Sequence, residues 1–187
     1  MDDAPAYTGS ASATPPMRRL LRSLGASILI AGGVFVADQA TKWLAQTYLT
    51  RAPDQSIPIV DDIMRLTYVA NRGAAFGILQ DQTMFFVVVG VAVIAVIVAS
   101  YRYFPMNGML LNLALGLQLG GAIGNLLDRI RYGFVVDFVD VGIRFGDGPR
   151  YIWPVFNLAD SAIVIGVGIL AFHLMRSPNK AASPRHA

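Results

Sequence analysis

Aspartate is the side chain with which this protein could do acid–base chemistry. All 12 acidic residues are aspartates, and the sequence contains no cysteine. Thiolate nucleophiles, thiolate metal sites and disulfides are therefore excluded. With only two histidines, His173 and His186, neither a histidine-rich metal site nor a Ser-His-Asp triad is expected, so we predict no metal and no cofactor. What remains is carboxylate chemistry.

Asp137 and Asp160 have the surroundings that an acid–base pair needs. Asp137 lies in the strand-like run Phe134–Asp140, whose apolar residues would raise the pKa of its carboxyl by desolvation. Asp160 comes three residues after Asn157, a good helix N-cap, where the helix dipole and free N–H groups favour a negative charge. One protonated and one ionised carboxylate can activate a water and then protonate a leaving amine, as in aspartic peptidases. Considered singly, each residue could instead be structural, as an ordinary edge-strand aspartate or a plain helix cap.

Charged residues near the other predicted membrane edges are more simply explained as supporting groups. Asp38 and Lys42 are four residues apart and share a helix face, which favours an ion pair over a reacting group. Asp128 and Arg129 end an apolar, glycine-rich stretch, and the planar fork of Arg129 could clamp a carboxylate. We assign a structural or positioning role to these four residues.

Two further features are weaker candidates. Asp140 is three residues from Asp137, so in a regular strand the two side chains point to opposite faces and cannot both line one site. The small-residue run that begins with Asn71 and Gly73 has two interpretations. It is either a flexible turn that leads into a helix, or a loop whose backbone and Asn71 approach a bound extended chain closely, as glycines permit.

The composition places these residues in a membrane protein. Hydrophobic residues make up 55% of the sequence and charged residues 14%, against about 25% charged in ordinary soluble domains. Four apolar stretches, at 24–44, 84–104, 109–127 and 158–175, have about the length that crosses a bilayer. The first could be a cleaved signal peptide, but it lacks a clear small-residue cleavage site. We predict one membrane domain over residues 17–176, between disordered tails at 1–16 and 177–187.

The segments between the spans predict where the site faces. Residues 57–69, 134–141 and 151–156 are rich in β-branched and aromatic residues and predict a small sheet on the side opposite the termini. Four spans put both termini on one side, and the arginines before the first span favour the cytoplasm for that side. The site then lies near the extracytoplasmic face.

The net charge of +3 comes from scattered basic residues, so no nucleic-acid partner is expected.

Five short motifs in this order closely resemble the lipoprotein signal peptidase family. Each motif alone is weak, but five in sequence on a four-span protein are highly specific, and the match runs from about residue 20 to 176. The motifs are Asp38-Gln39-x-x-Lys42, Asn71-x-Gly73-Ala74-Ala75-Phe76-Gly77, Gly124-Asn125-Leu126-x-Asp128-Arg129, Val135-Val136-Asp137-Phe138 and Phe156-Asn157-x-Ala159-Asp160.

The resemblance implies a bacterial inner-membrane aspartic endopeptidase. Such an enzyme removes the signal peptide from diacylglyceryl-modified prolipoproteins, cutting just before the lipid-bearing cysteine. By the same resemblance it has four transmembrane helices with a small outer sheet and is inhibited by cyclic peptides such as globomycin. We further expect contact with membrane lipids and a monomer, although the sequence does not determine the oligomeric state. Asp137 and Asp160 match the catalytic positions. The positions that match substrate-binding or supporting residues are Asp38, Lys42, Asn71, Gly73, Asn125, Arg129 and Asn157.

Two other classes of membrane protein stay open at this point. A small proton-coupled transporter could use Asp38, Asp137 and Asp160 as a relay. Its charges would have to connect across the bilayer, whereas these gather at one predicted face. In a structural subunit, all of these residues would merely cap helices and pair with one another.

Overall fold

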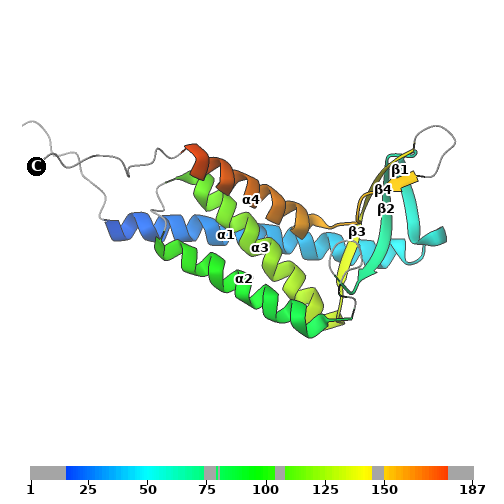
Figure 1. The fold of residues 1–187 in the computed structure, drawn as a ribbon, viewed down its shortest axis with the longest axis horizontal. Helices are drawn as coiled ribbons and strands as arrows, with labels where there is room; N and C mark the ends of the chain where they lie inside the picture. Colours follow the sequence, from blue (N-terminus) through cyan, green and yellow to red (C-terminus); the bar gives the residue numbers. More distant parts are fainter. Residues whose placement is uncertain (1–15, 74–78, 80, 104–107, 145–149, 177–187) are drawn as a thin grey trace, which may run out of the picture.

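The part of the chain that the structure describes forms four long helices, two short helical segments and a small sheet (Figure 1). The computed structural model describes residues 16–73, 79, 81–103, 108–144 and 150–176. The helices are α1 (Pro16–Leu44), α2 (Thr83–Tyr103), α3 (Met109–Tyr132) and α4 (Leu158–Arg176). The strands are β1 (Ser56–Val60), β2 (Met64–Asn71), β3 (Val135–Arg144) and β4 (Arg150–Ile152), in the sheet order β1-β2-β3-β4. Except for Pro16, which begins α1, the tails expected at 1–16 and 177–187 lie outside the described residues.

All four helices are long and apolar enough to cross a membrane, which confirms the predicted fold class. The candidate spans are Leu24–Leu49, Thr83–Tyr101, Met109–Tyr132 and Leu158–Arg176. Along α2, apolar side chains such as Val88, Val91 and Val96 are exposed. A helix that presents apolar side chains to its surroundings is stable where those surroundings are lipid rather than water.

Two of the spans are longer than the sequence predicted, and each has a local cause. After Leu44 the chain continues without a break as a π-helical segment, η1 (Ala45–Leu49). The third span continues past residue 127 because the charged residues that end its apolar stretch are still helical. It stops at Gly133, which has a φ of 79° and donates its N–H to the Arg129 carbonyl. Glycine reaches this left-handed conformation without strain, as is common after a helix end.

The central helix is α3, which contacts α1, α2 and α4 (Figure 1). Its glycines allow close approach on two sides. A Cβ added to Gly120 would lie 2.5 Å from the Ala31 carbonyl oxygen of α1. One added to Gly121 would lie 2.5 Å from the Ala159 carbonyl oxygen of α4. Small residues at a membrane helix interface let the backbones pack directly, so α3 fixes where the first turn of α4 lies.

The predicted small sheet is present at one end of the bundle (Figure 1). The expected run 57–69 is not one strand but the antiparallel hairpin β1–β2, which turns at residues 61–63. The next strand, β3, pairs with β2, so that Val69 lies opposite Asp137 and Asn71 opposite Val135. The sheet packs on η1, the continuation of α1, through the fully buried Val136, which contacts Ala45 and Leu49. β3 therefore carries Asp137 over the ends of the helices.

The close contact between α3 and α4 can be tested by adding one methyl group. We expect Gly121→Ala to lower the melting temperature of the detergent-solubilised protein, because overpacking a tight interface typically costs roughly 1–3 kcal/mol. Gly33→Ala is the matched control, since nothing lies within 4 Å of its added Cβ. Alanine is favoured over glycine by about 1 kcal/mol inside a helix, so the control should melt at or above the parent temperature. Equal melting temperatures for the two variants would show that α3 and α4 are not in close contact there.

Candidate active site

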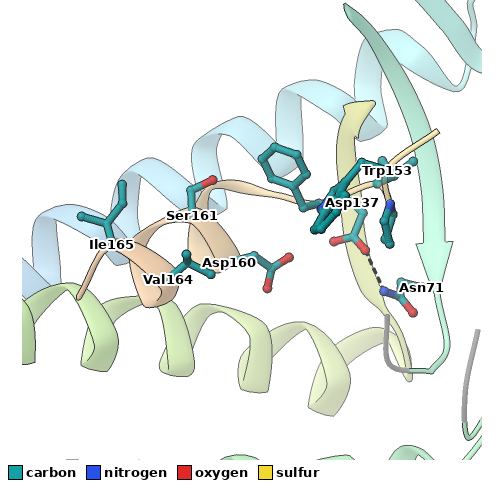
Figure 2. Close-up of a pocket in the computed structure, with 10 residues that line it drawn as sticks. Asn71, Asp137, Trp153, Asp160, Ser161, Val164 and Ile165 are labelled. Carbon is teal, nitrogen blue, oxygen red and sulfur yellow. Dashed lines mark hydrogen bonds between the residues drawn. The ribbon is translucent and has the colours of Figure 1, made fainter. Parts of the chain in front are cut away.

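A pocket of about 590 Å³ lies between the sheet and the start of α4. Asp137 enters it from β3 and Asp160 from the first turn of α4, and Figure 2 shows both carboxylates directed into the same space. The pocket is lined by Asn71, Asp137, Trp153, Pro154, Val155, Phe156, Asp160, Ser161, Val164 and Ile165. The two aspartates predicted to act together are therefore brought to one site.

Asp137 is almost completely buried, with 1% of its surface exposed. Asn71 donates to its Oδ2 at 2.8 Å, and Asn157 donates to its Oδ1 at 2.7 Å. Burial raises the pKa of Asp137 to about 7, and the nearby charge of Asp160 adds to the rise, while the two amides oppose it. An upward shift of this pKa is what the apolar residues around Asp137 predicted. At neutral pH this carboxyl therefore exists in both its protonated and its ionised form.

Asp160 is held by a reciprocal cap at the start of α4. Its N–H donates to Asn157 Oδ1 at 2.9 Å, while the N–H of Asn157 donates to Asp160 Oδ2 at 3.3 Å. This exchange is a capping box, which fixes the first turn of a helix. Asn125 of α3 donates to the other carboxylate oxygen at 2.7 Å. The predicted capping role of Asn157 is thus confirmed, and the same residue also contacts Asp137.

A buried ion cluster lies behind the pair, and we call Asp38, Lys42 and Asp128 the ion triad. Lys42 Nζ lies 2.9 Å from Asp38 Oδ2 and 2.9 Å from Asp128 Oδ2. All three residues are at most 2% exposed. The predicted pairing of Asp38 with Lys42 is confirmed. Asp128 is the second partner of Lys42, which local spacing in the sequence could not indicate.

The ion triad also binds the two segments that carry the pocket aspartates. Asp38 Oδ1 accepts the N–H of Ala159, at the start of α4, at 3.0 Å. Asp128 Oδ2 accepts the N–H of Val136, next to Asp137, at 3.2 Å. One charged cluster is therefore hydrogen-bonded to the backbone beside both carboxylates.

The other predicted site residues lie around this centre. Arg129 does not clamp a carboxylate within the described part of the chain. Its Nη2 lies 3.5 Å from the Gly73 carbonyl, and its guanidinium is 4.9 Å from the ring centre of Phe86. The N–H of Gly73 donates to Asn71 Oδ1 at 3.0 Å. The segment that begins at Asn71 is thus tied to Asp137 and to α3.

Asp140 is separate from the pocket, as the strand alternation predicted. It is buried and accepts a hydrogen bond from the Thr67 hydroxyl at 3.1 Å. The sequence interpretation missed Gln39, whose amide donates to Asp128 Oδ1 at 3.0 Å and to Asp38 Oδ2 at 3.2 Å. Its signals in the sequence were its place beside Asp38 and its position in the motif Asp38-Gln39-x-x-Lys42. Within the described ranges, no three His, Cys, Asp or Glu side chains are arranged to hold a metal ion, and metal independence stays a prediction.

Fold and site together define a class of protein. Four helices suited to a membrane present two carboxylates to a shared pocket, one of them with a pKa near neutrality. These are the components of an integral membrane hydrolase that uses aspartates as acid and base.

Comparison with known proteins gives the family. The family model for signal peptidase (SPase) II matches residues 30–176. The lipoprotein signal peptidase of Moorella thermoacetica is 48% identical over 148 residues, which cover 79% of this chain and 91% of that relative. That of Bacillus velezensis is 42% identical over 152 residues, or 81% and 95% of the two chains. The chain belongs to the signal peptidase II family of aspartic peptidases.

Solved structures agree with this assignment. A bacterial membrane enzyme determined by the in meso method is 32% identical, with a TM-score of 0.69 over 87% of this chain and 95% of that one. A second such structure is 34% identical, with a TM-score of 0.65 over 82% and 94% of the two chains.

The double role of Asn157 can be separated by substitution. Asn157→Ser keeps an oxygen that can cap α4 but removes the amide that donates to Asp137. Because that donor lowers the pKa of Asp137, its loss should raise the pKa above the parent value of about 7. Infrared titration of the protonated carboxyl in the purified protein measures this shift. Thr67→Val removes a donor from Asp140 instead and should leave the titration unchanged. A titration of Asn157→Ser that coincides with the parent would show that this hydrogen bond does not act on Asp137.

Proposed function

We propose that this protein removes signal peptides from lipid-modified prolipoproteins, cutting before the lipid-bearing cysteine, with Asp137 and Asp160 as its catalytic pair. The observation that carries the proposal is the convergence of both carboxylates on one pocket from two different elements (Figure 2). Membership in the signal peptidase II family supports the substrate class.

The two aspartates divide the steps of hydrolysis. Asp160, whose carboxylate accepts the N–H of Asn157 and the side-chain amide of Asn125, takes a proton from a water that attacks the scissile carbonyl carbon. Asp137, with its pKa raised to about 7, supplies a hydrogen bond to the carbonyl oxygen as negative charge develops there. When the tetrahedral intermediate collapses, the C–N bond breaks and the proton held by Asp160 passes to the leaving amine. The pair ends with the one shared proton with which it began.

The pocket is placed to receive a substrate from the bilayer. Val164 and Ile165 of α4 line it and are 69% and 55% exposed, so its apolar wall continues onto the lipid-facing surface of the bundle. A diacylglyceryl chain can remain in lipid while the peptide beside it reaches the aspartates. Contact with membrane lipids, competition by cyclic peptides such as globomycin at this pocket, and action as a monomer belong to the same proposal.

The proposed location is the bacterial inner membrane, with both termini in the cytoplasm and the pocket near the extracytoplasmic face. The start of α1 and the end of α4 lie together at the end of the bundle away from the sheet (Figure 1). Three arginines precede the first span, which favours a cytoplasmic start. The ion triad and both pocket aspartates gather at the sheet end, which supports a peptidase over a proton relay across the bilayer.

Removing either carboxylate tests the catalytic assignment. We expect Asp137→Asn and Asp160→Asn to remain folded and to lose at least about 10²-fold in kcat, the lower range for positioned acid–base groups. Asn keeps the shape of the side chain but cannot exchange the proton. Cleavage of a lipidated precursor peptide by the purified variants measures the loss. Asp140→Asn makes the same change at a buried aspartate of β3 outside the pocket and should retain activity. Near-normal cleavage by either of the first two variants rules the assignment out.

The pH profile tests whether the pair shares one proton. Because the pKa of Asp137 is raised to about 7, kcat/KM should decline as the pH rises through that value and the pair loses its proton. In acid it should decline again, as the pair takes up a second proton. Coupled carboxylates titrate as a unit, so the two apparent pKa values belong to the pair. A flat profile across both limbs, in a folded enzyme with chemistry rate-limiting, contradicts the shared proton.

A further inference from the structure

Three side-chain amides contact the pocket aspartates, and each of them is held in a single orientation. Asn71 Oδ1 accepts the N–H of Gly73, and Asn157 Oδ1 accepts the N–H of Asp160. A backbone N–H can only donate, so the NH2 end of each amide must point the other way. In both cases that end donates to Asp137. The local backbone alone therefore sets the direction of these two amides.

The orientation of the third amide, that of Asn125, is fixed by side chains rather than by the backbone. Its Oδ1 accepts from Lys42 Nζ at 2.9 Å and from Asn157 Nδ2 at 3.1 Å. The Asn157 amide is already fixed by the backbone, so both partners can only donate, and the ammonium of Lys42 is the closer and the charged one of the two. The ammonium has three protons and contacts three oxygens, those of Asp38, Asp128 and Asn125. With its oxygen held there, Asn125 must present its NH2 to Asp160 Oδ1.

We propose that Lys42 is a positioning residue for the peptidase reaction, acting through Asn125 to keep a hydrogen-bond donor against Asp160. This inference rests on the proposed catalytic pair. All four carboxylate oxygens of the pair accept one protein donor, from Asn71 and Asn157 on Asp137, and from Asn125 and the Asn157 backbone on Asp160. A carboxyl proton cannot occupy a lone pair that already faces a donor. The shared proton is therefore confined to the lone pairs that face the pocket, where water and the scissile bond meet the pair.

If Asn125 were reversed, its carbonyl oxygen would face Asp160 and repel the ionised carboxylate. The proton would then be drawn onto the buried oxygen of Asp160, away from the substrate. Charges from three elements act on this contact. They are Asp38 and Lys42 of α1, Asp128 and Arg129 of α3, and Asp137 of β3.

Two variants test the role while keeping the protein folded. Asn125→Asp leaves an oxygen for Lys42 but replaces the donor to Asp160 with a second carboxyl. When protonated, that carboxyl can donate as the amide does, and when ionised it repels Asp160. We expect the alkaline limb of the kcat/KM profile to move to lower pH, with activity recovering in acid towards the parent value.

The second variant removes the cation together with one of its two carboxylate partners, and it leaves Asp38 with the N–H of Ala159 and the Gln39 amide. Lys42→Met with Asp128→Asn leaves the same net charge at the ion triad, because one positive and one negative group are removed together. We expect kcat to fall by up to about 10²-fold with little change in KM, as for a misaligned catalytic group. The limbs of its pH profile should also move, because Asn125 loses its charged donor and keeps only the 3.1 Å contact from Asn157. Asp140→Asn is the control and should keep both limbs in place.

The outcomes separate this inference from the proposed function. The inference is supported if the limbs of the kcat/KM pH profile shift in both test variants while Asp137→Asn and Asp160→Asn are inactive. If those two single variants are inactive but both test variants keep the parent limb positions and only lose folded protein, Lys42 is merely structural and the inference fails alone. If Asp137→Asn or Asp160→Asn cleaves normally, the proposed function fails and the inference with it.

Discussion

The buried ammonium of Lys42 lies between two carboxylates at the level where the helices meet the sheet. Removing one partner of a buried ion pair typically costs about 3–5 kcal/mol, because the other charge is left without compensation. The carboxylates of this cluster also accept backbone N–H groups. Asp38 accepts that of Ala159 on its other oxygen, and Asp128 accepts that of Val136 on the oxygen that contacts Lys42. The start of α4 and the start of β3 are therefore bound to the same charge cluster. A shift of either segment would break a charge-assisted hydrogen bond in a medium where water cannot replace it.

Close helix packing is what brings the charges of the ion triad within reach of one another. Lys42 and Asp38 come from α1, whereas Asp128 comes from α3. The two helices can approach because α3 has glycine where they meet. A Cβ on Gly124 would collide with the carboxylate of Asp38, and one on Gly120 with the backbone of Ala31. The small residues of α3 and the ion triad therefore act together. The glycines permit the approach, and the charges make a single register favourable.

The sequence was informative wherever the deciding interaction is local. The four spans follow from runs of apolar residues, the Asn157 cap from its three-residue spacing to Asp160, and the Asp38–Lys42 pair from helical periodicity. The opposite facing of Asp137 and Asp140 follows from strand alternation.

Contacts between distant segments could not be predicted in this way. That Asp128 would meet Lys42 depends on which faces of α1 and α3 pack, and apolar periodicity is weak in helices surrounded by lipid. The family motifs marked Asn125 as a supporting residue, but the direction of its amide is visible only in the network around it.

In the proposed mechanism one carboxyl of the pair is protonated while the other is ionised, and a difference in their surroundings favours one of the two arrangements. In this protein the difference arises from the backbone elements that carry them. Asp137 is enclosed in a strand among apolar residues, where its pKa rises to about 7. Asp160 lies in the first turn of a helix, where its carboxylate accepts the N–H of Asn157 and the side-chain amide of Asn125. The inequality is therefore a property of the fold itself, and it is present before any substrate enters the pocket.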